Sequence, residues 1–208
     1  MPVILVANPK GGVGKSTIAT NVAGYFARQG WPVMLGDIDK QQSSRAWLGI
    51  RSPDLPKIRN WEAEADGQLR TPKGVAHVVL DTPAGLSGER LKEMLRVADK
   101  VIVPLQPSIF DILATQEFLA HIADRKVVRE GHTSVGVVGM RVDARTRSAD
   151  QLLRFVEGLG LPILGYLRDT QNYVQLAAHG LTLWDVAASR VEKDLAQWQT
   201  LIDWIQKK

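Results

Sequence analysis

The sequence of 208 residues contains no cysteine. Thiolate ligands for zinc or for an iron–sulfur cluster are therefore excluded, and the composition agrees with a reducing compartment. No apolar run approaches the roughly 20 residues that a membrane span requires. The N-terminus also lacks the charged and then apolar segments of a secretory signal. We therefore expect a cytoplasmic protein.

The chain has little excess of either charge and no concentrated basic tail. The 26 Lys and Arg residues against 22 Asp and Glu give a net charge of +4, which favours a polyanionic partner only weakly. With 45% hydrophobic and 23% charged residues, the chain resembles a globular protein that can bury a full core. Because no linker interrupts it, we expect residues 1–208 to form a single domain.

The stretch NPKGGVGKST, residues 8–17, follows a short apolar run and precedes a segment with helical apolar spacing. This order of strand, glycine loop and helix is typical of a phosphate loop. Glycines let consecutive N–H groups turn toward an anion, and the helix adds its positive end. We expect Lys15 to reach the β- and γ-phosphates and Ser16 to hold Mg²⁺. The expected nucleotide-binding residues are Lys10, Gly11, Gly12, Val13, Gly14, Lys15, Ser16 and Thr17.

Two details depart from the general phosphate-loop pattern. Pro9 occupies its first glycine position, and a second lysine, Lys10, precedes the glycine pair. KGGVGKS resembles the deviant Walker A motif of the family that includes ParA partition ATPases, MinD, the arsenite-pump ATPase and the nitrogenase iron protein. The resemblance implies that Lys10 reaches across a nucleotide-sandwich dimer, so Lys10 and Lys15 are both expected to serve catalysis. Without cysteine, the nitrogenase iron protein is excluded among these relatives.

A predicted strand over 33–37 ends in the segment DIDKQQSS. In an open parallel sheet, ligands bind at the carboxyl ends of the strands. The segment is similar to the DxDPQ stretch of ParA proteins, with Lys40 where proline is usual. By that similarity Asp39 is the catalytic residue that orients the attacking water, and Asp37 supports the magnesium shell. Carboxylates at strand ends also occur as simple turn caps, and that alternative stays open here.

The predicted strand HVVLD, residues 77–81, matches a Walker B strand. Its terminal carboxylate, Asp81, is expected to hold the metal through water. The following segment, DTPAG, is similar to the family's DTPP, whose loop senses the γ-phosphate. A buried strand with a capping aspartate is the alternative.

The remaining pattern alternates strands and helices. Further strands are expected at 100–104, 134–140 and 162–166, with helices at 16–29, 112–128, 148–157 and 184–205. Residues 41–74 are interpreted as an irregular crossover with a short strand at 57–61. This alternation predicts the α/β class, a predominantly parallel twisted sheet with helices on both faces and right-handed crossovers.

Taken together, the motifs identify the chain as similar to ParA-type ATPases, in the short form without an N-terminal helix-turn-helix domain. The resemblance implies an ATPase, slow on its own, that uses ATP and Mg²⁺ and forms a homodimer. It also implies nonspecific DNA binding on the nucleoid and stimulation by a ParB-like or cargo-specific adaptor. The cargo would be a plasmid, a chromosome region or a protein assembly.

The DNA contacts are expected in the C-terminal third, where the ParA resemblance places the DNA face. The candidates are Arg168, Arg190 and Lys193, and the alternative for each is a solvated helix charge.

Three other functions remain open. A MinD-like, membrane-recruited regulator of cell division would need an exposed amphipathic tail. In the predicted helix 184–205 and its flanks, basic and acidic residues balance, which opposes an electrostatic membrane anchor. A P-loop metabolic ligase would turn over ATP only with a small substrate, and a non-hydrolysing switch would show no turnover with any partner.

Overall fold

The computed structural model describes residues 2–39, 41–61 and 77–207. Within them, seven strands form one sheet in the order β3-β2-β4-β1-β5-β6-β7. Every neighbouring pair is parallel, so the predicted class is confirmed. The strands are β1 (Val3–Val6), β2 (Val33–Asp37), β3 (Ile58–Trp61), β4 (His77–Asp81), β5 (Lys100–Leu105), β6 (Ser134–Met140) and β7 (Ile163–Leu167).

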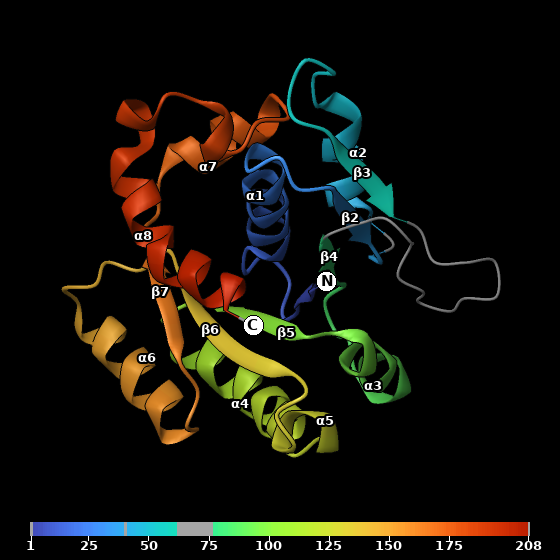
Figure 1. Cartoon of the computed structure of the whole chain (residues 1–208). Helices are drawn as coiled ribbons and strands as arrows, with labels where there is room; N and C mark the ends of the chain where they lie inside the picture. The colour runs from blue at the N-terminus through green and yellow to red at the C-terminus, as the bar shows by residue number, and fades with distance from the viewer. Residues whose placement is uncertain (1, 40, 62–76, 208) are drawn as a thin grey trace.

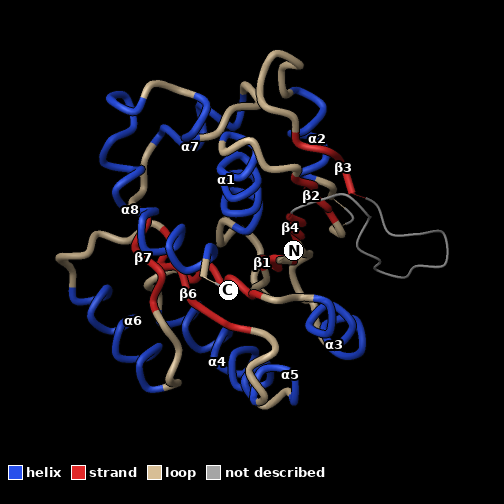
Figure 2. The backbone as a smooth tube through the Cα atoms, in the orientation of Figure 1, coloured by secondary structure: helices blue, strands red, loops and turns tan. Residues whose placement is uncertain are grey.

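Helices cover both faces of this sheet, as Figures 1 and 2 show. One face packs against α1 (Lys15–Arg28), α2 (Ser43–Ile50), α7 (Gln171–Ala178) and α8 (Ala188–Gln206). The other packs against α3 (Gly88–Val97), α4 (Ile109–Ala123), α5 (Lys126–Arg129) and α6 (Arg147–Gly158). Parallel sheets are covered in this way because both of their faces are apolar.

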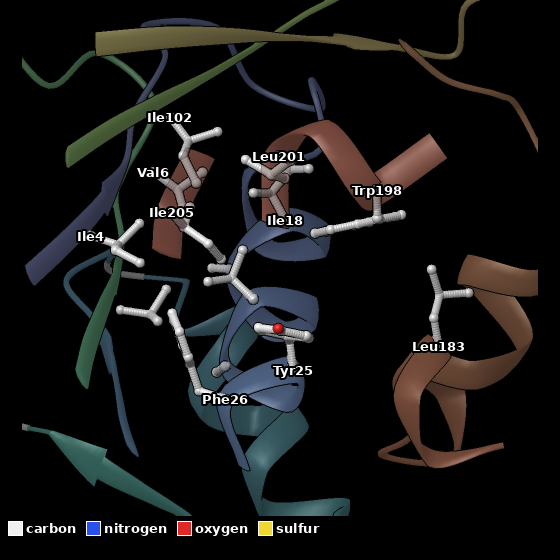
Figure 3. Packing of buried hydrophobic residues seen from close by; sticks show 14 of the residues in the cluster. Ile4, Val6, Ile18, Tyr25, Phe26, Ile102, Leu183, Trp198, Leu201 and Ile205 are labelled. Carbon is white, nitrogen blue, oxygen red and sulfur yellow. The ribbon is translucent and has the colours of Figure 1, made fainter. Parts of the chain in front are cut away.

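Side chains of β1 alternate between the two cores. Ile4 and Val6 lie in the cluster with α1 and α8, whereas Leu5 lies in the cluster with α3 and α4. In Figure 3, Ile18 of α1 and Trp198 of α8 lie in the same packed cluster as Ile4 and Val6. Successive side chains of β1 point to opposite faces of the sheet, and both faces are buried. This explains why the strand is a continuous hydrophobic run.

The C-terminal helix packs on the sheet, as its apolar stripe predicted. It begins later than expected, because a short 3₁₀ turn, η1 (Leu183–Asp185), precedes α8, which also bends at Val191. Its apolar side is buried against α1, with Trp198, Leu201 and Ile205 in the core. Within the described ranges, no helix is long and apolar enough to cross a membrane.

The largest error of the sequence interpretation falls between β2 and β4. Residues 43–50 form helix α2, although we expected an irregular crossover there. The helix has a weak pattern, because Ser44 and Trp47 are its buried side chains. The short strand expected at 57–61 is confirmed as β3, and residues 62–74 of the predicted crossover lie outside the described residues.

Other helices also differ from expectation. The single helix expected at 112–128 is two, α4 and α5, separated at Asp124 and Arg125. Helices α3 and α7 were not predicted at all. The other strands and helices have bounds within a few residues of those expected.

Candidate nucleotide-binding site

The predicted phosphate loop connects the carboxyl end of β1 to α1, and Asn8 fixes its position. The buried Asn8 amide donates to the Pro104 carbonyl at 2.8 Å and to the Thr115 hydroxyl at 3.2 Å. Its side-chain oxygen accepts the N–H of Lys10 at 2.8 Å. One side chain therefore ties the loop to both β5 and α4.

Two glycines of the loop have backbone conformations that a side chain would strain. Gly12 has φ of 72° and Gly14 has φ of 98°. A Cβ on Gly14 would also lie 2.5 Å from the Met140 Cε atom. Helix α1 starts directly after Gly14, with no capping side chain and no acid in its first turn. Its free N–H groups and its dipole therefore suit an anion.

Lys15 is held beneath this loop. The residue is only 8% exposed, and its Nζ donates to the Lys10 carbonyl at 2.7 Å. Burial lowers the pKa of Lys15, and the carboxylates of Asp81 and Asp39 partly oppose that shift. The Lys15 ammonium therefore lies close to the loop. An anionic ligand bound there could replace the Lys10 carbonyl as its hydrogen-bond partner.

Asp81 lies opposite Asp37 in the paired strands β4 and β2. Asp81 is 2% exposed; its Oδ2 accepts the Ser44 hydroxyl at 2.6 Å, and its Oδ1 has no hydrogen-bond partner among the described residues. Burial raises the pKa of Asp81 to about 6, although the hydroxyls of Ser16 and Ser44 lower it. A buried carboxylate oxygen without a partner is costly unless a ligand satisfies it.

The donor set fits Mg²⁺. Magnesium is usually held by one or two carboxylates together with phosphate oxygens and water. The free oxygen of Asp81 and the hydroxyl of Ser16 at the start of α1 supply such ligands, and Asp37 lies opposite Asp81 in the neighbouring strand. No cluster of three or more His, Cys, Asp or Glu side chains suited to a metal occurs in the part of the chain that the structure describes.

The carboxylate of Asp37 serves as the cap of α2. Its Oδ2 accepts the N–H groups of Ser44 at 2.7 Å and Arg45 at 3.2 Å, and its Oδ1 accepts the N–H of Asp39 at 3.0 Å. Asp39 itself lies at the exit of β2 and accepts the N–H of Gln41. Lys40, which replaces the usual proline, lies outside the described residues.

The Lys10 side chain extends from the loop toward α4. Its Nζ lies 3.0 Å from the Asp111 carboxylate at the first turn of α4. The ammonium is partly exposed there, as a contact to a second subunit would require.

A cavity of about 170 Å³ lies beside the loop, between the segments that follow β6 and β7. It was not foreseen, because its lining comes from several distant segments of the sequence. Its lining residues are Val13, Gly14, Thr17, Met140, Arg141, Arg168, Asp169, Thr170, Tyr173, Val174 and Ala177.

The three predicted DNA-contacting residues have different environments. Arg190 and Lys193 are exposed on α8. The Arg168 Nε instead donates to the Asp194 carboxylate at 2.6 Å, and Asp194 is fully buried. Arg168 therefore has a structural task that the two α8 residues lack.

Residues 4–183 match the protein family described as the CobQ/CobB/MinD/ParA nucleotide binding domain. The chain belongs to this family. Among curated relatives of this ParA/MinD member, "Maintenance of carboxysome distribution protein A" of Gloeobacter kilaueensis is 30% identical over 185 residues, covering 87% of this chain and 83% of the relative. "Chromosome-partitioning ATPase Soj" of Thermus thermophilus is 31% identical over 185 residues, covering 72% and 73%. The expected family is thereby confirmed.

Solved structures support the fold. The MinC:MinD cell division protein complex of Aquifex aeolicus contains a chain similar to this family member, with a TM-score of 0.74 and 15% identity. The match covers 100% of this chain and 97% of that chain. At this identity, the likeness shows the ParA/MinD fold and nothing more.

Replacing Lys15 should weaken nucleotide binding. In Lys15→Ala we expect ATP affinity to fall tenfold or more, because a charge-assisted contact contributes on the order of 1.5–3 kcal/mol. Calorimetric titration with ATP and Mg²⁺ measures this, and the control is Lys92→Ala, which removes a partly exposed lysine of α3. Wild-type ATP affinity in Lys15→Ala would contradict the assignment of residues 8–17 as the phosphate-binding loop.

Proposed function

We propose that this protein is an ATP-dependent positioning ATPase that dimerises on ATP, binds DNA without sequence preference and segregates or positions a cargo. A partner adaptor stimulates its hydrolysis, and its place in the cell is the nucleoid. One observation carries the proposal: the glycine loop with its two lysines, Lys10 and Lys15, lies at the same sheet edge as Asp39 and Asp81.

Each side chain has a distinct task in the proposed reaction. Lys15 neutralises the terminal phosphates, and the N–H groups of the loop and of α1 bind their oxygens. Asp39 orients the attacking water. Ser16 and Asp81 hold Mg²⁺, which supplies charge neutralisation at the phosphates when it is bound. The nucleoside occupies the cavity beside Thr17.

The proposed dimer is supported by the surface around Lys10. Ile109, Phe110 and Leu113 lie on the first turns of α4 with their side chains more than half exposed, Phe110 by 75%. The contact between Lys10 and Asp111 places this apolar group next to the phosphate loop. Exposed apolar side chains gathered in one place are typical of an interaction surface.

The packing of α8 favours DNA over membrane as the binding surface. A membrane-recruited protein needs a free amphipathic face, and the apolar side of α8 is buried in the core with Trp198 and Ile202. The exposed side of α8 carries Arg190 and Lys193. These two residues are therefore the candidates best placed to contact phosphates.

Binding and chemistry should separate in two variants. Asp39→Ala should bind ATP, lose turnover and accumulate as a dimer, because it keeps Lys15 and Ser16 but loses the residue that orients water. Lys10→Ala should bind ATP and stay monomeric, since its proposed contact lies across the subunit interface. Light scattering with ATP and Mg²⁺, combined with phosphate release, measures both.

The control for this pair is Lys126→Ala, which removes an exposed lysine of α5 and should behave as wild type. A monomeric Asp39→Ala or a dimeric Lys10→Ala would contradict the role given to that residue.

DNA binding should depend on ATP and on salt. Phosphate contacts release counterions, so affinity should fall steeply as salt rises and should be the same for different sequences. Arg190→Ala and Lys193→Ala should each lower the slope of log affinity against log salt by about 1. Fluorescence anisotropy of a labelled duplex across a salt series, with ATP and with ADP, measures these slopes.

Arg168→Ala is a poor probe of DNA contact, because it also removes one of the two side-chain donors to the buried Asp194 carboxylate, the other being the Asn172 amide. The variant should therefore lose stability for a reason unrelated to DNA. Lys126→Ala, on the opposite face of the sheet, should leave the slope unchanged. Equal affinity with ATP and ADP, or preference for one sequence, would contradict nonspecific, nucleotide-gated DNA binding.

A further inference from the structure

Ser44 is the residue through which α2 touches both acidic strand ends. Its side chain is completely buried, with 0% exposed. Its hydroxyl donates to Asp81 Oδ2 at 2.6 Å, and its N–H donates to Asp37 Oδ2 at 2.7 Å. The contact to Asp37 uses the backbone, so only the contact to Asp81 depends on the hydroxyl. Ser44 therefore fixes two carboxylates relative to each other.

The bond from Ser44 leaves one oxygen of Asp81 free. Asp81 Oδ2 is occupied by the hydroxyl, while Oδ1 is buried and has no partner among the described residues. A carboxylate rotates about its last bond, so the short hydrogen bond from Ser44, together with the Ser16 hydroxyl that also acts on this carboxylate, decides which oxygen remains available. The free oxygen is the one we assigned to the metal shell.

The far end of α2 is also anchored. The Arg51 guanidinium donates to both oxygens of Asp185, at 2.7 and 2.9 Å, and to the Gly180 carbonyl at 2.9 Å. The two side chains of this ion pair are almost fully buried. With both ends held, α2 cannot easily shift along its axis, and the Ser44 hydroxyl stays in place.

We propose that Ser44 is a positioning residue for the magnesium site: its hydroxyl orients Asp81 so that the free oxygen receives the metal shell. This inference rests on the proposed ATPase function, because it concerns Mg²⁺ bound together with nucleotide. Groups that orient metal ligands in this way typically affect metal affinity or activity by about 10–100-fold when they are removed.

The experiment measures nucleotide affinity as a function of Mg²⁺. Fluorescent ATP analogue is titrated into wild type and Ser44→Ala at a series of Mg²⁺ concentrations and in EDTA. We expect Ser44→Ala to require about 10–100-fold more Mg²⁺ than wild type to reach the same gain in nucleotide affinity. Its nucleotide affinity in EDTA should equal that of wild type. A general structural defect would lower affinity in EDTA as well.

Three further variants make the result specific. Ser44→Thr keeps a hydroxyl and should recover most of the Mg²⁺ response, whereas Ser44→Cys has similar size but a weak donor and should resemble Ser44→Ala. Ser43→Ala changes the neighbouring exposed serine and should match wild type. Ser44→Cys also keeps the test valid if Ser44→Ala does not fold.

A wild-type Mg²⁺ response in Ser44→Ala or Ser44→Cys would overturn the inference and leave the proposed function intact. The same holds if Ser43→Ala and Ser44→Ala shift the response equally. If instead the wild type binds nucleotide without any response to Mg²⁺, the proposed function fails first, and the inference that rests on it fails with it.

Discussion

The structure depends on two opposite charges buried at one edge of the sheet, Lys15 and Asp81. Removing each charge from water costs on the order of several kcal/mol, and their mutual attraction offsets part of that. The Lys10 carbonyl and the Ser44 hydroxyl satisfy one side of each group. What remains unsatisfied is a buried carboxylate oxygen next to a loop of N–H donors. A phosphate and a cation bound together would neutralise both.

Neighbouring elements hold this edge in place from two directions. The Asn8 amide joins the start of the phosphate loop to β5 and α4. These two hydrogen bonds keep the loop from closing onto the buried Lys15 side chain. Helix α2 is capped by Asp37 at one end and joined by Arg51 to Asp185 at the other. The site is therefore continuous with the C-terminal segment that carries α8. A change at the proposed metal site would reach that segment through α2.

Local sequence pattern predicted most of the fold and the centre of the site. The apolar runs of β1 and β5 are fully buried, and the glycine loop needs particular dihedrals, so both leave a strong local signal. The sequence signal of helix α2 is weak, because its first turn is stabilised by Asp37, which lies seven residues before Ser44. The Lys10–Asp111 and Arg51–Asp185 contacts join residues about 100 or more positions apart. Such pairings follow from the strand order, which periodicity does not reveal.

The most direct test is a crystal structure with a non-hydrolysable ATP analogue and Mg²⁺. The account predicts that Lys15 leaves the Lys10 carbonyl for the terminal phosphates. It also predicts that the free oxygen of Asp81 faces the metal shell while Ser44 keeps the other. An analogue bound away from residues 8–17, or a metal without Asp81 near it, would contradict the account.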